Sequence, residues 1–180
     1  NAYPRTFVRW SPATAAATPW IDFCPGSLVE DDTSLFGVEY DPEPARSLVQ
    51  VDKASGTRTV RDHFIGPGIA LDGSFVYYEN AAQHEVRRAP LEGGPGSSLV
   101  SIGDSGPQFA LLATSSTGLF ATTTNGSQSS IVRVASDGTI SDVVSDIATP
   151  YVLCFGVSDD VIYYGTADAT PLFVILIGEL

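Results

Sequence analysis

The sequence is short of residues on which several classes of protein depend. Its 180 residues include no methionine, two cysteines, two histidines and a single lysine among nine basic residues. Two cysteines, Cys24 and Cys154, are too few for a small disulfide-stapled scaffold, and they have no zinc-site spacing. They allow one bridge or two thiols, and we expect two free buried thiols.

Positive charge is also scarce. Twenty-one acidic residues against nine basic ones give a formal net charge of -12. This balance argues against nucleic acid as a partner, because nucleic-acid binding requires clustered Lys and Arg. In residues 91–180, nine acidic residues stand against one basic residue, Arg133. We interpret the acidic surface as solubilising; the alternatives are a cationic partner and a divalent ion.

Long hydrophobic runs are absent as well. A membrane-spanning helix needs about 18 to 20 apolar residues, and the longest run here, residues 172–177, has only the length of a strand. We therefore expect no transmembrane segment. The chain begins at Asn1 rather than Met, which we interpret as processing or trimming. With one lysine and many Ser, Thr, Gly and Asp residues, we expect an exported protein, extracellular, periplasmic or on the cell surface.

The sequence does contain an internal repeat with a period near 43 residues. Each repeat opens on a proline: Pro19, Pro67, Pro107 or Pro150. Apolar residues follow each proline two and four positions later. A second strand is predicted at 35–38, 75–78, 119–122 and 161–164. A third is predicted at 48–51, 86–89, 131–134 and 172–175, and a fourth at 57–61, 97–101 and 139–144. No window predicts a helix, because Gly, Pro and β-branched residues interrupt every candidate.

Four short antiparallel strands in about 40 to 45 residues are typical of a β-propeller blade. The sequence therefore predicts an all-β fold, a single β-propeller domain with about four repeats. Their expected boundaries are 19–66, 67–106, 107–149 and 150–180, with 1–18 as an N-terminal strand and closure segment.

The second repeat carries the most specific motif. Residues 69–94 read IALDGSFVYYENAAQHEVRRAPLEGG. They resemble the YWTD propeller repeats of lipoprotein-receptor ectodomains and the related repeats of myxobacterial extracellular proteins. In those repeats a Tyr-Trp-Thr-Asp strand precedes a strand ending Arg-Ala-x-Leu-Asp-Gly. Residues 77–80 and 88–93 occupy these places, with Asn80 where the family has Asp.

The resemblance implies a binding or scaffolding propeller outside the cytoplasm, with a protein or glycan ligand and no catalytic residues. The rings of that family have six blades, which at this period takes about 260 residues. Three arrangements stay open: a piece of a longer polypeptide, a four-bladed ring closed by the N-terminal segment, or a partial ring completed by another chain or by self-association. We favour the first, because both ends of the sequence fall within a repeat.

The run Gly103-Asp104-Ser105-Gly106 matches the nucleophile loop of trypsin-like serine proteases. A serine nucleophile needs a base and an acid that orients it, and only His63 and His84 could supply the base. The run falls between a fourth and a first strand, so we interpret it as a connection between blades and predict no catalytic residue. The alternative is a propeller lyase or hydrolase with His63 or His84 at the ring mouth.

The candidate ligand-binding residues are Tyr78, Tyr164, His63 and His84. Tyr78 and Tyr164 each follow another tyrosine, in the pairs Tyr77-Tyr78 and Tyr163-Tyr164. Strand alternation sends the two members of a pair to opposite faces of the sheet, so that one packs between blades and the other is available to a ligand. The pairs Asp31-Asp32 and Asp159-Asp160 precede second strands. We interpret them as solvated turn residues and predict no metal site; calcium binding by these oxygens is the alternative.

Overall fold

A computed structural model of the chain describes residues 6–11, 16–22, 27–40, 46–63, 65–103, 106, 108–149, 152–158, 161–166 and 173–176. Every helix or strand within these residues is a β-strand. No helix that could span a membrane is found in this part of the chain. The all-β class predicted from the sequence is confirmed.

The strands form five antiparallel sheets, and within each sheet the strands follow chain order. The N-terminal hairpin consists of β1 (Thr6–Ser11) and β2 (Ala16–Asp22). Blade 1 consists of β3 (Leu28–Glu30), β4 (Ser34–Tyr40), β5 (Arg46–Asp52) and β6 (Arg58–His63). Blade 2 consists of β7 (Ile65–Leu71), β8 (Phe75–Asn80), β9 (Glu85–Pro90) and β10 (Ser97–Ser101). Blade 3 consists of β11 (Gln108–Ser115), β12 (Gly118–Thr124), β13 (Ser129–Val134) and β14 (Ile140–Ile147). Blade 4 consists of β15 (Val152–Ser158), β16 (Val161–Thr166) and β17 (Phe173–Leu176).

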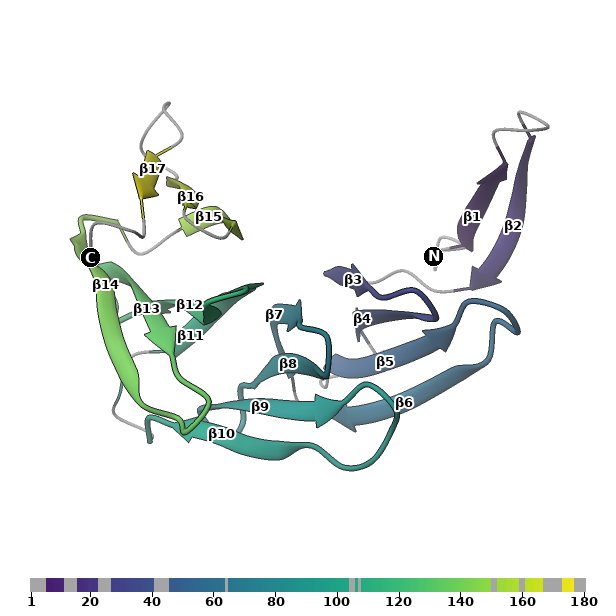
Figure 1. Cartoon of the computed structure of the whole chain (residues 1–180), viewed down its shortest axis with the longest axis horizontal. Helices are drawn as coiled ribbons and strands as arrows, with labels where there is room; N and C mark the ends of the chain where they lie inside the picture. The colour runs from purple at the N-terminus through teal and green to yellow at the C-terminus, as the bar shows by residue number, and fades with distance from the viewer. Residues whose placement is uncertain are drawn as a thin grey trace.

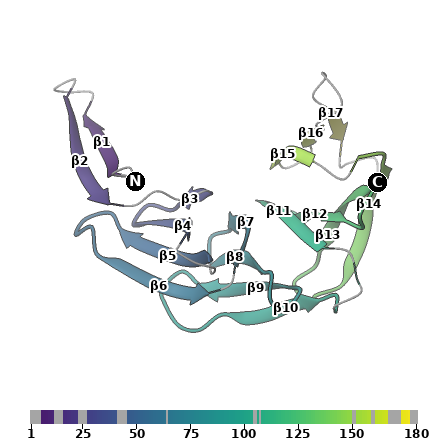
Figure 2. The same cartoon turned by 180° about the vertical axis from the view of Figure 1, so that it is seen from behind.

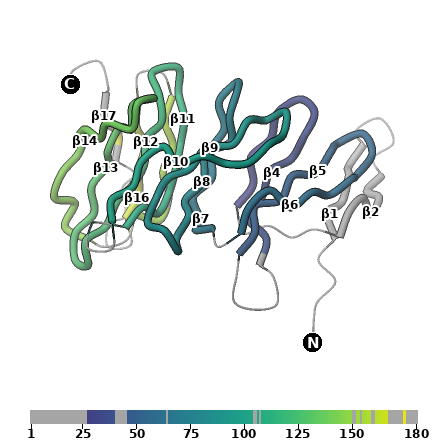
Figure 3. Tube along the Cα trace, turned by 90° about the horizontal axis from the view of Figure 1, so that it is seen from below, coloured from purple at the N-terminus to yellow at the C-terminus, as the bar shows by residue number. Residues whose placement is uncertain are grey.

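The sheets follow one another along an open arc (Figure 1). The N-terminal hairpin and blade 4 stand at its two ends, as the view from behind also shows (Figure 2). Seen from below, the blades form successive layers from one terminus to the other (Figure 3). The first strands β3, β7, β11 and β15 are neighbours in space and line the inner side of the arc. Among the described strands, none of blade 4 pairs with the hairpin.

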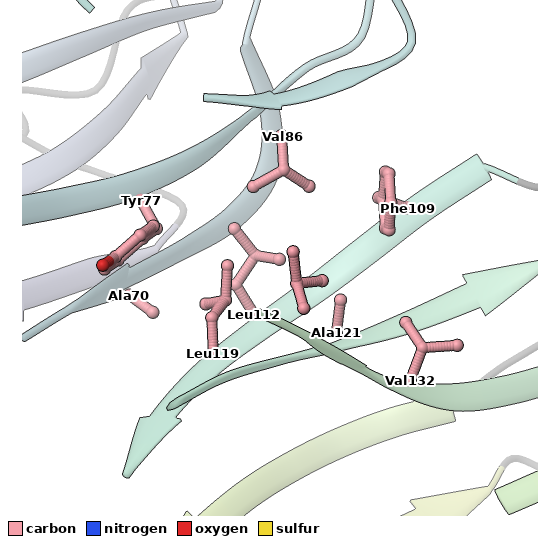
Figure 4. Packing of buried hydrophobic residues seen from close by; sticks show 9 residues of the cluster. Ala70, Tyr77, Val86, Phe109, Leu112, Leu119, Ala121 and Val132 are labelled. Atoms are coloured by element: carbon pink, nitrogen blue, oxygen red, sulfur yellow. The ribbon is translucent and has the colours of Figure 1, made fainter. Parts of the chain in front are cut away.

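The second strand of each blade sends alternate side chains to the two neighbouring blades. Phe36 packs with residues of blade 2, Tyr77 with blade 3 and Phe120 with blade 4. Figure 4 shows Tyr77 in the cluster that also contains Leu112 of blade 3. The equivalent residue of blade 4 is Tyr163. These four positions, 36, 77, 120 and 163, are 41, 43 and 43 residues apart, in agreement with the repeat seen in the sequence.

The adjacent residues of the second strands point toward the preceding blade. Tyr78 lies in the cluster between blades 1 and 2, whereas Tyr77 lies in the one between blades 2 and 3. Tyr164 packs with Phe120 of blade 3. The predicted division of the tyrosine pairs between opposite faces of the sheet is confirmed.

The first strand of the first repeat was predicted in the wrong place. Residues 19–22 belong to β2, where Pro19 pairs with Val8 next to a shift in register. The first strand of blade 1 is β3 instead, and its Leu28 pairs with Gly37 of β4. Proline is tolerated in β2 because this strand is at the edge of a two-stranded sheet. A better marker in the sequence is Pro25, which precedes Pro67 by 42 residues.

The inner strands approach one another very closely between blades 2 and 3. A β-carbon added to Gly68 of β7 would lie 2.4 Å from the carbonyl oxygen of Ala110 in β11. It would also lie 3.1 Å from Leu112 Cγ. This contact therefore requires a residue without a side chain at position 68.

Candidate functional site

The run that resembles a protease nucleophile loop lies between β10 and β11, as predicted. Ser105, Asp104 and Pro107 are outside the described residues. On either side of them the chain turns: Gly103 has a φ of 68°, and the Gly106 amide donates a 3.3 Å hydrogen bond to the Gly103 carbonyl. The run thus joins blade 2 to blade 3.

Each blade has two ends that differ in what they carry. The hairpin end carries the turns between the first and second strands and between the third and fourth, such as residues 72–74 and 135–139. The connector end carries the turns between the second and third strands and the segments that lead to the next blade, such as residues 81–84 and 102–106. Candidate site residues occur at both ends.

The two histidines are at the connector end of different blades. His63 is the last residue of β6, and its Nδ1 lies 2.9 Å from Ser47 Oγ. Ser47 is 0% exposed, so its hydroxyl is not accessible to a substrate, whereas His63 is exposed. His84 lies in the turn before β9 with a φ of 52°, and its carbonyl accepts a hydrogen bond from the Ile102 amide. No hydrogen bond in the described part of the chain joins the two imidazoles.

A polar network joins blades 1 and 2 at the connector end. The Tyr78 hydroxyl donates a 2.7 Å hydrogen bond to Asp62 Oδ2. The same oxygen lies 3.5 Å from Arg87 Nε, and Arg87 donates further bonds to Gln83 Oε1 and the Gly96 carbonyl. Burial, and then the bond to Asp62, raises the pKa of Tyr78 above its ordinary value. The phenol therefore remains protonated and acts as a fixed donor between the blades.

Removing the Tyr78 hydroxyl should weaken the contact between blades 1 and 2. In the Tyr78→Phe variant Asp62 loses a buried donor, so we expect the free energy of unfolding to fall by about 1–2 kcal/mol. Equilibrium urea denaturation measures this difference. The matched control is Tyr163→Phe, which changes a side chain that is 39% exposed and should alter stability little. Equal losses in the two variants would contradict the role given to the Tyr78 hydroxyl.

The other candidate tyrosine is also between blades. Tyr164 is 8% exposed and Tyr78 is 0% exposed. The structure does not bring them together, because Tyr164 packs on blade 3 and Tyr78 on blade 1. Ligand contact by Tyr78, Tyr164, His63 and His84 stays a prediction.

A buried carboxyl group lies near the network, on the same strand as Tyr78. Glu79 is 8% exposed, and its Oε2 has no hydrogen-bond partner. The side chain occupies the space beside Gly66, where an added β-carbon would lie 1.7 Å from the same oxygen. Burial raises the pKa of Glu79 to about 7, although the positive charge of Arg46 acts in the opposite direction.

A second tyrosine–aspartate pair lies at the hairpin end of blade 2. Asp72 Oδ1 accepts hydrogen bonds of 2.7 Å from the amides of Ser74 and Phe75, which fixes the turn. Asp72 Oδ2 accepts a 2.5 Å bond from the Tyr77 hydroxyl. Burial, followed by the hydrogen bond and charge of Asp72, raises the pKa of Tyr77 to about 12. Both oxygens of the carboxylate are therefore used in holding the scaffold.

This pair forms one wall of a cleft of about 310 Å³ between blades 2 and 3. The lining is rich in hydroxyl groups and comprises Asp72, Tyr77, Leu99, Thr114, Ser115, Ser116, Thr117, Gly118, Leu119, Arg133, Val134, Ala135 and Ser136. Arg133 Nη2 donates to the Thr117 carbonyl. Arg88 approaches the same edge, with Nη1 3.4 Å from the Ser136 carbonyl. The lining of the cleft therefore combines hydroxyl groups and apolar side chains with one carboxylate, which is bonded to Tyr77, and the guanidinium group of Arg133.

A second cleft of about 180 Å³ lies between the same blades toward the connector end. Its polar lining residues are Thr123, Asn125, Gln128, Ser130, Asp142 and Asp146. No group of three or more His, Cys, Asp or Glu side chains that could hold a metal ion occurs among the described residues. The second cleft therefore contains amide and carboxylate oxygens, but its described residues do not form a cluster that could hold a metal ion.

Of the aspartates that are candidates for calcium binding, Asp31 stabilises a turn. Asp31 Oδ1 accepts 2.7 Å hydrogen bonds from the amides of Thr33 and Ser34 and fixes the turn before β4. Asp159 and Asp160 are outside the described residues, so calcium binding by either pair stays a prediction. Cys24 is likewise outside them, and only the backbone of Cys154 is described.

Sequence reasoning did not find Asp62, Arg87 or Arg133 as site residues. Asp62 meets Tyr78 only after blades 1 and 2 pack, whereas Arg87 is the residue paired with Tyr78 across the β8–β9 hairpin of blade 2. The contact of Asp72 with Tyr77, five residues later, has a signal in the sequence, because blade 1 also has an aspartate, Asp31, five residues before its aromatic residue Phe36.

No family model matches the sequence, and no curated protein matches it either. The chain is similar to a solved structure of a nidogen/laminin complex, with a TM-score of 0.53, 13% identity, and coverage of 82% of this chain and 73% of that chain. The fold is a β-propeller. The propeller is also similar to a gluconolactonase from Xanthomonas campestris, with a TM-score of 0.58, 15% identity and coverage of 91% of this chain.

The match to the gluconolactonase extends over 63% of that chain, so this propeller spans less than two thirds of its length. At 13% and 15% identity the two similarities establish the fold alone. Propellers carry both binding and catalytic sites, and the assignment of function therefore depends on the residues of this chain.

Proposed function

We propose that this chain is a non-enzymatic binding or scaffold module of YWTD-type repeats, located outside the cytoplasm. The cleft between blades 2 and 3 supports the proposal. Its carboxylate and phenol are bonded to one another and to the turn, so they fix the wall of the cleft beside the hydroxyl-bearing residues. A pKa of about 12 keeps the Tyr77 hydroxyl protonated, so its bond to Asp72 is retained over the whole physiological range.

The alternative is a lyase or hydrolase with a site at the ring mouth. Such an enzyme needs an accessible base or nucleophile within hydrogen-bonding reach of its partner. In the described residues the serine–histidine contact uses the fully buried Ser47. Glu79, with a pKa of about 7, is 8% exposed and lines neither of the two clefts. These observations favour binding over catalysis.

The composition of the cleft favours a neutral, hydroxyl-rich ligand, and we propose a glycan. The hydroxyl groups of Ser115, Thr117 and Ser136 can each donate and accept hydrogen bonds, which suits sugar hydroxyls. The net charge of -12 repels polyanions at long range. A loop of another protein is the alternative ligand for the same cleft.

Blocking the cleft should remove glycan binding while leaving the fold intact. Ala135 is exposed and lines the cleft, so a tryptophan there fills the space without removing a hydrogen bond. Ala82 is exposed in the turn at the opposite end of blade 2, and Ala82→Trp is the matched control. The probe is an array of neutral and acidic oligosaccharides, followed by titration calorimetry of the retained sugars.

We expect neutral sugars to be retained and Ala135→Trp to weaken their binding at least about tenfold, with Ala82→Trp unchanged. Equal effects of the two variants would place binding elsewhere on the propeller. Retention of no sugar at all would contradict the glycan assignment.

A further inference from the structure

The space between blades 2 and 3 is filled less completely than the space between blades 1 and 2. In the latter, Tyr78 occupies the connector end of the gap, and Arg87 is paired with it across the sheet. Blade 3 has Ala121 at the position of Tyr78, 43 residues later, and Val132 is paired with Ala121. The smaller side chains leave the cavity of about 180 Å³, which Val132 lines.

The wall that blade 3 gives to this cavity changes from apolar to polar along the sheet. Phe109, Thr123 and Ser130 are paired in one row across β11, β12 and β13. Directly paired residues lie on the same face of a sheet, and Phe109 packs toward blade 2, so the whole row faces blade 2. Asp142 is paired with Val132 on that face. Figure 4 shows Phe109 and Val132 at the end of the apolar cluster opposite Tyr77.

Thr123 brings a hydroxyl group without a partner to the wall of the cavity. The residue is 7% exposed, and its hydroxyl group forms no hydrogen bond with any described residue. The equivalent residue of blade 2 is Asn80, whose Oδ1 accepts a 3.1 Å hydrogen bond from the Gln83 amide. Buried polar groups in proteins almost always have a partner, because burial without one is costly. A polar group of a ligand would supply the partner that Thr123 lacks.

The rim of the cavity carries negative charge that no basic residue of blade 3 balances. Asp142 and Asp146 both line it and are exposed. Neither forms an ion pair within the described residues. Arg133 is the one basic residue of positions 91–180, and it lines the other cleft, where it donates to the Thr117 carbonyl. The electrostatic field at this rim therefore favours a cation.

We propose that this cavity binds a primary alkylammonium group. An ammonium head has three donors and no acceptor, which suits the Thr123 hydroxyl oxygen and the two carboxylates. The side chains of Ile102, Phe109 and Ile140 provide apolar contact for the alkyl chain. Calcium prefers six to eight oxygen ligands, and a wall with this share of apolar side chains suits it poorly.

The same ammonium chemistry is present in a free alkylamine and in a lysine side chain of another polypeptide. The site is separate from the cleft proposed for the glycan. Ala135→Trp, which fills that cleft, should therefore leave ammonium binding unchanged, and either proposal can fail without the other.

The test is calorimetric titration of the 180-residue chain with n-pentylamine at neutral pH. Salt at about 0.15 M screens the general attraction of a cation to an acidic protein. We expect one site per chain, and binding at least about tenfold weaker for n-pentanol, which has the same chain without the charge. Nα-acetyl-lysine methylamide is the second probe: tighter binding than n-pentylamine identifies a lysine side chain as the ligand, and weaker binding identifies a free amine.

Two substitutions test the residues of the site. Thr123→Val keeps the shape of the side chain and removes the hydroxyl, so the dissociation constant should rise about tenfold. Asp142→Asn should raise it about two- to fivefold, as expected for an exposed ion pair. Glu92→Gln is the matched control, because it removes one exposed carboxylate at the hairpin end of blade 2 and should leave binding unchanged.

Three results would overturn the proposal. The first is equal affinity for n-pentylamine and n-pentanol, or no binding of either. The second is an equal loss in Asp142→Asn and Glu92→Gln, with none in Thr123→Val, because general charge attraction then accounts for binding. The third is displacement of the amine by micromolar calcium, which would assign the cavity to a metal ion. Thermal melting of each variant confirms that a loss of binding is not a loss of folding.

Discussion

The Glu79→Gln variant is expected to be more stable than the unchanged protein at pH 8, by on the order of 3 kcal/mol. The pKa of Glu79 is raised by burial from 4.5 to about 7, and only the charge of Arg46 opposes the shift. Below pH 4.5 the group is protonated in both the folded and the unfolded chain. Between the two values the folded chain holds a proton that the unfolded chain has lost, so stability falls as the pH rises. Above pH 7 folding requires burial of a carboxylate whose Oε2 has no hydrogen-bond partner among the described residues.

Urea denaturation at pH 4, 6 and 8 measures the effect as the difference between the variant and the unchanged protein. Glutamine has nearly the same shape as glutamate, and the cost of burying its amide does not depend on pH. The difference should be small at pH 4 and grow through the interval from 4.5 to 7. Glu92→Gln changes an exposed carboxylate and serves as the control for net charge. Parallel pH profiles for all three proteins would show that Glu79 is accessible to water in the folded state.

The Phe120→Ala variant should lose about 3–5 kcal/mol of unfolding free energy. Phe120 is 0% exposed and packs with Ile131, Ile162 and Tyr164 between blades 3 and 4. Truncation removes apolar contact and leaves a cavity, because strands in two sheets cannot easily collapse onto it. Urea denaturation at low protein concentration measures the loss.

The control for Phe120→Ala is Tyr163→Ala, at the equivalent position of blade 4. Its side chain is 39% exposed, so we expect a loss below about 1 kcal/mol in the monomer. The two residues occupy the same position in their blades and differ in burial, at 0% and 39% exposed. A large loss in the Tyr163 variant would show that its side chain is buried within the monomer.

Most strands could be predicted because their signals are local. The fourth strand of blade 2, β10, covers residues 97–101 in both the prediction and the structure. The third strands were found equally well, since apolar runs between turn residues define them without reference to the rest of the chain. The exception is β2, whose sequence has the proline and the alternating apolar residues that mark the first strand of the other repeats. Its pairing with β1 decides its place, and pairing is a property of two segments rather than one.

The candidate site was predicted in part for the same reason. Alternation along β8 is local, and it placed Tyr77 and Tyr78 correctly on opposite faces. The partners of Tyr78 were not found, because Asp62 is 16 residues away in another blade and meets it only when the two sheets pack. The cleft with Arg133 likewise depends on the spacing between blades 2 and 3, which no single repeat contains.

The contact between Gly68 and Ala110 has a consequence for the size of the ring. At the inner edge, blades 2 and 3 are separated by a backbone-to-backbone distance with no space for a β-carbon. One strand further out, a tyrosine ring fills the gap between the same sheets. Each pair of blades is therefore a wedge, narrow inside and wide outside. The angle of that wedge, fixed by a glycine and an aromatic residue, determines how many blades fit around the axis.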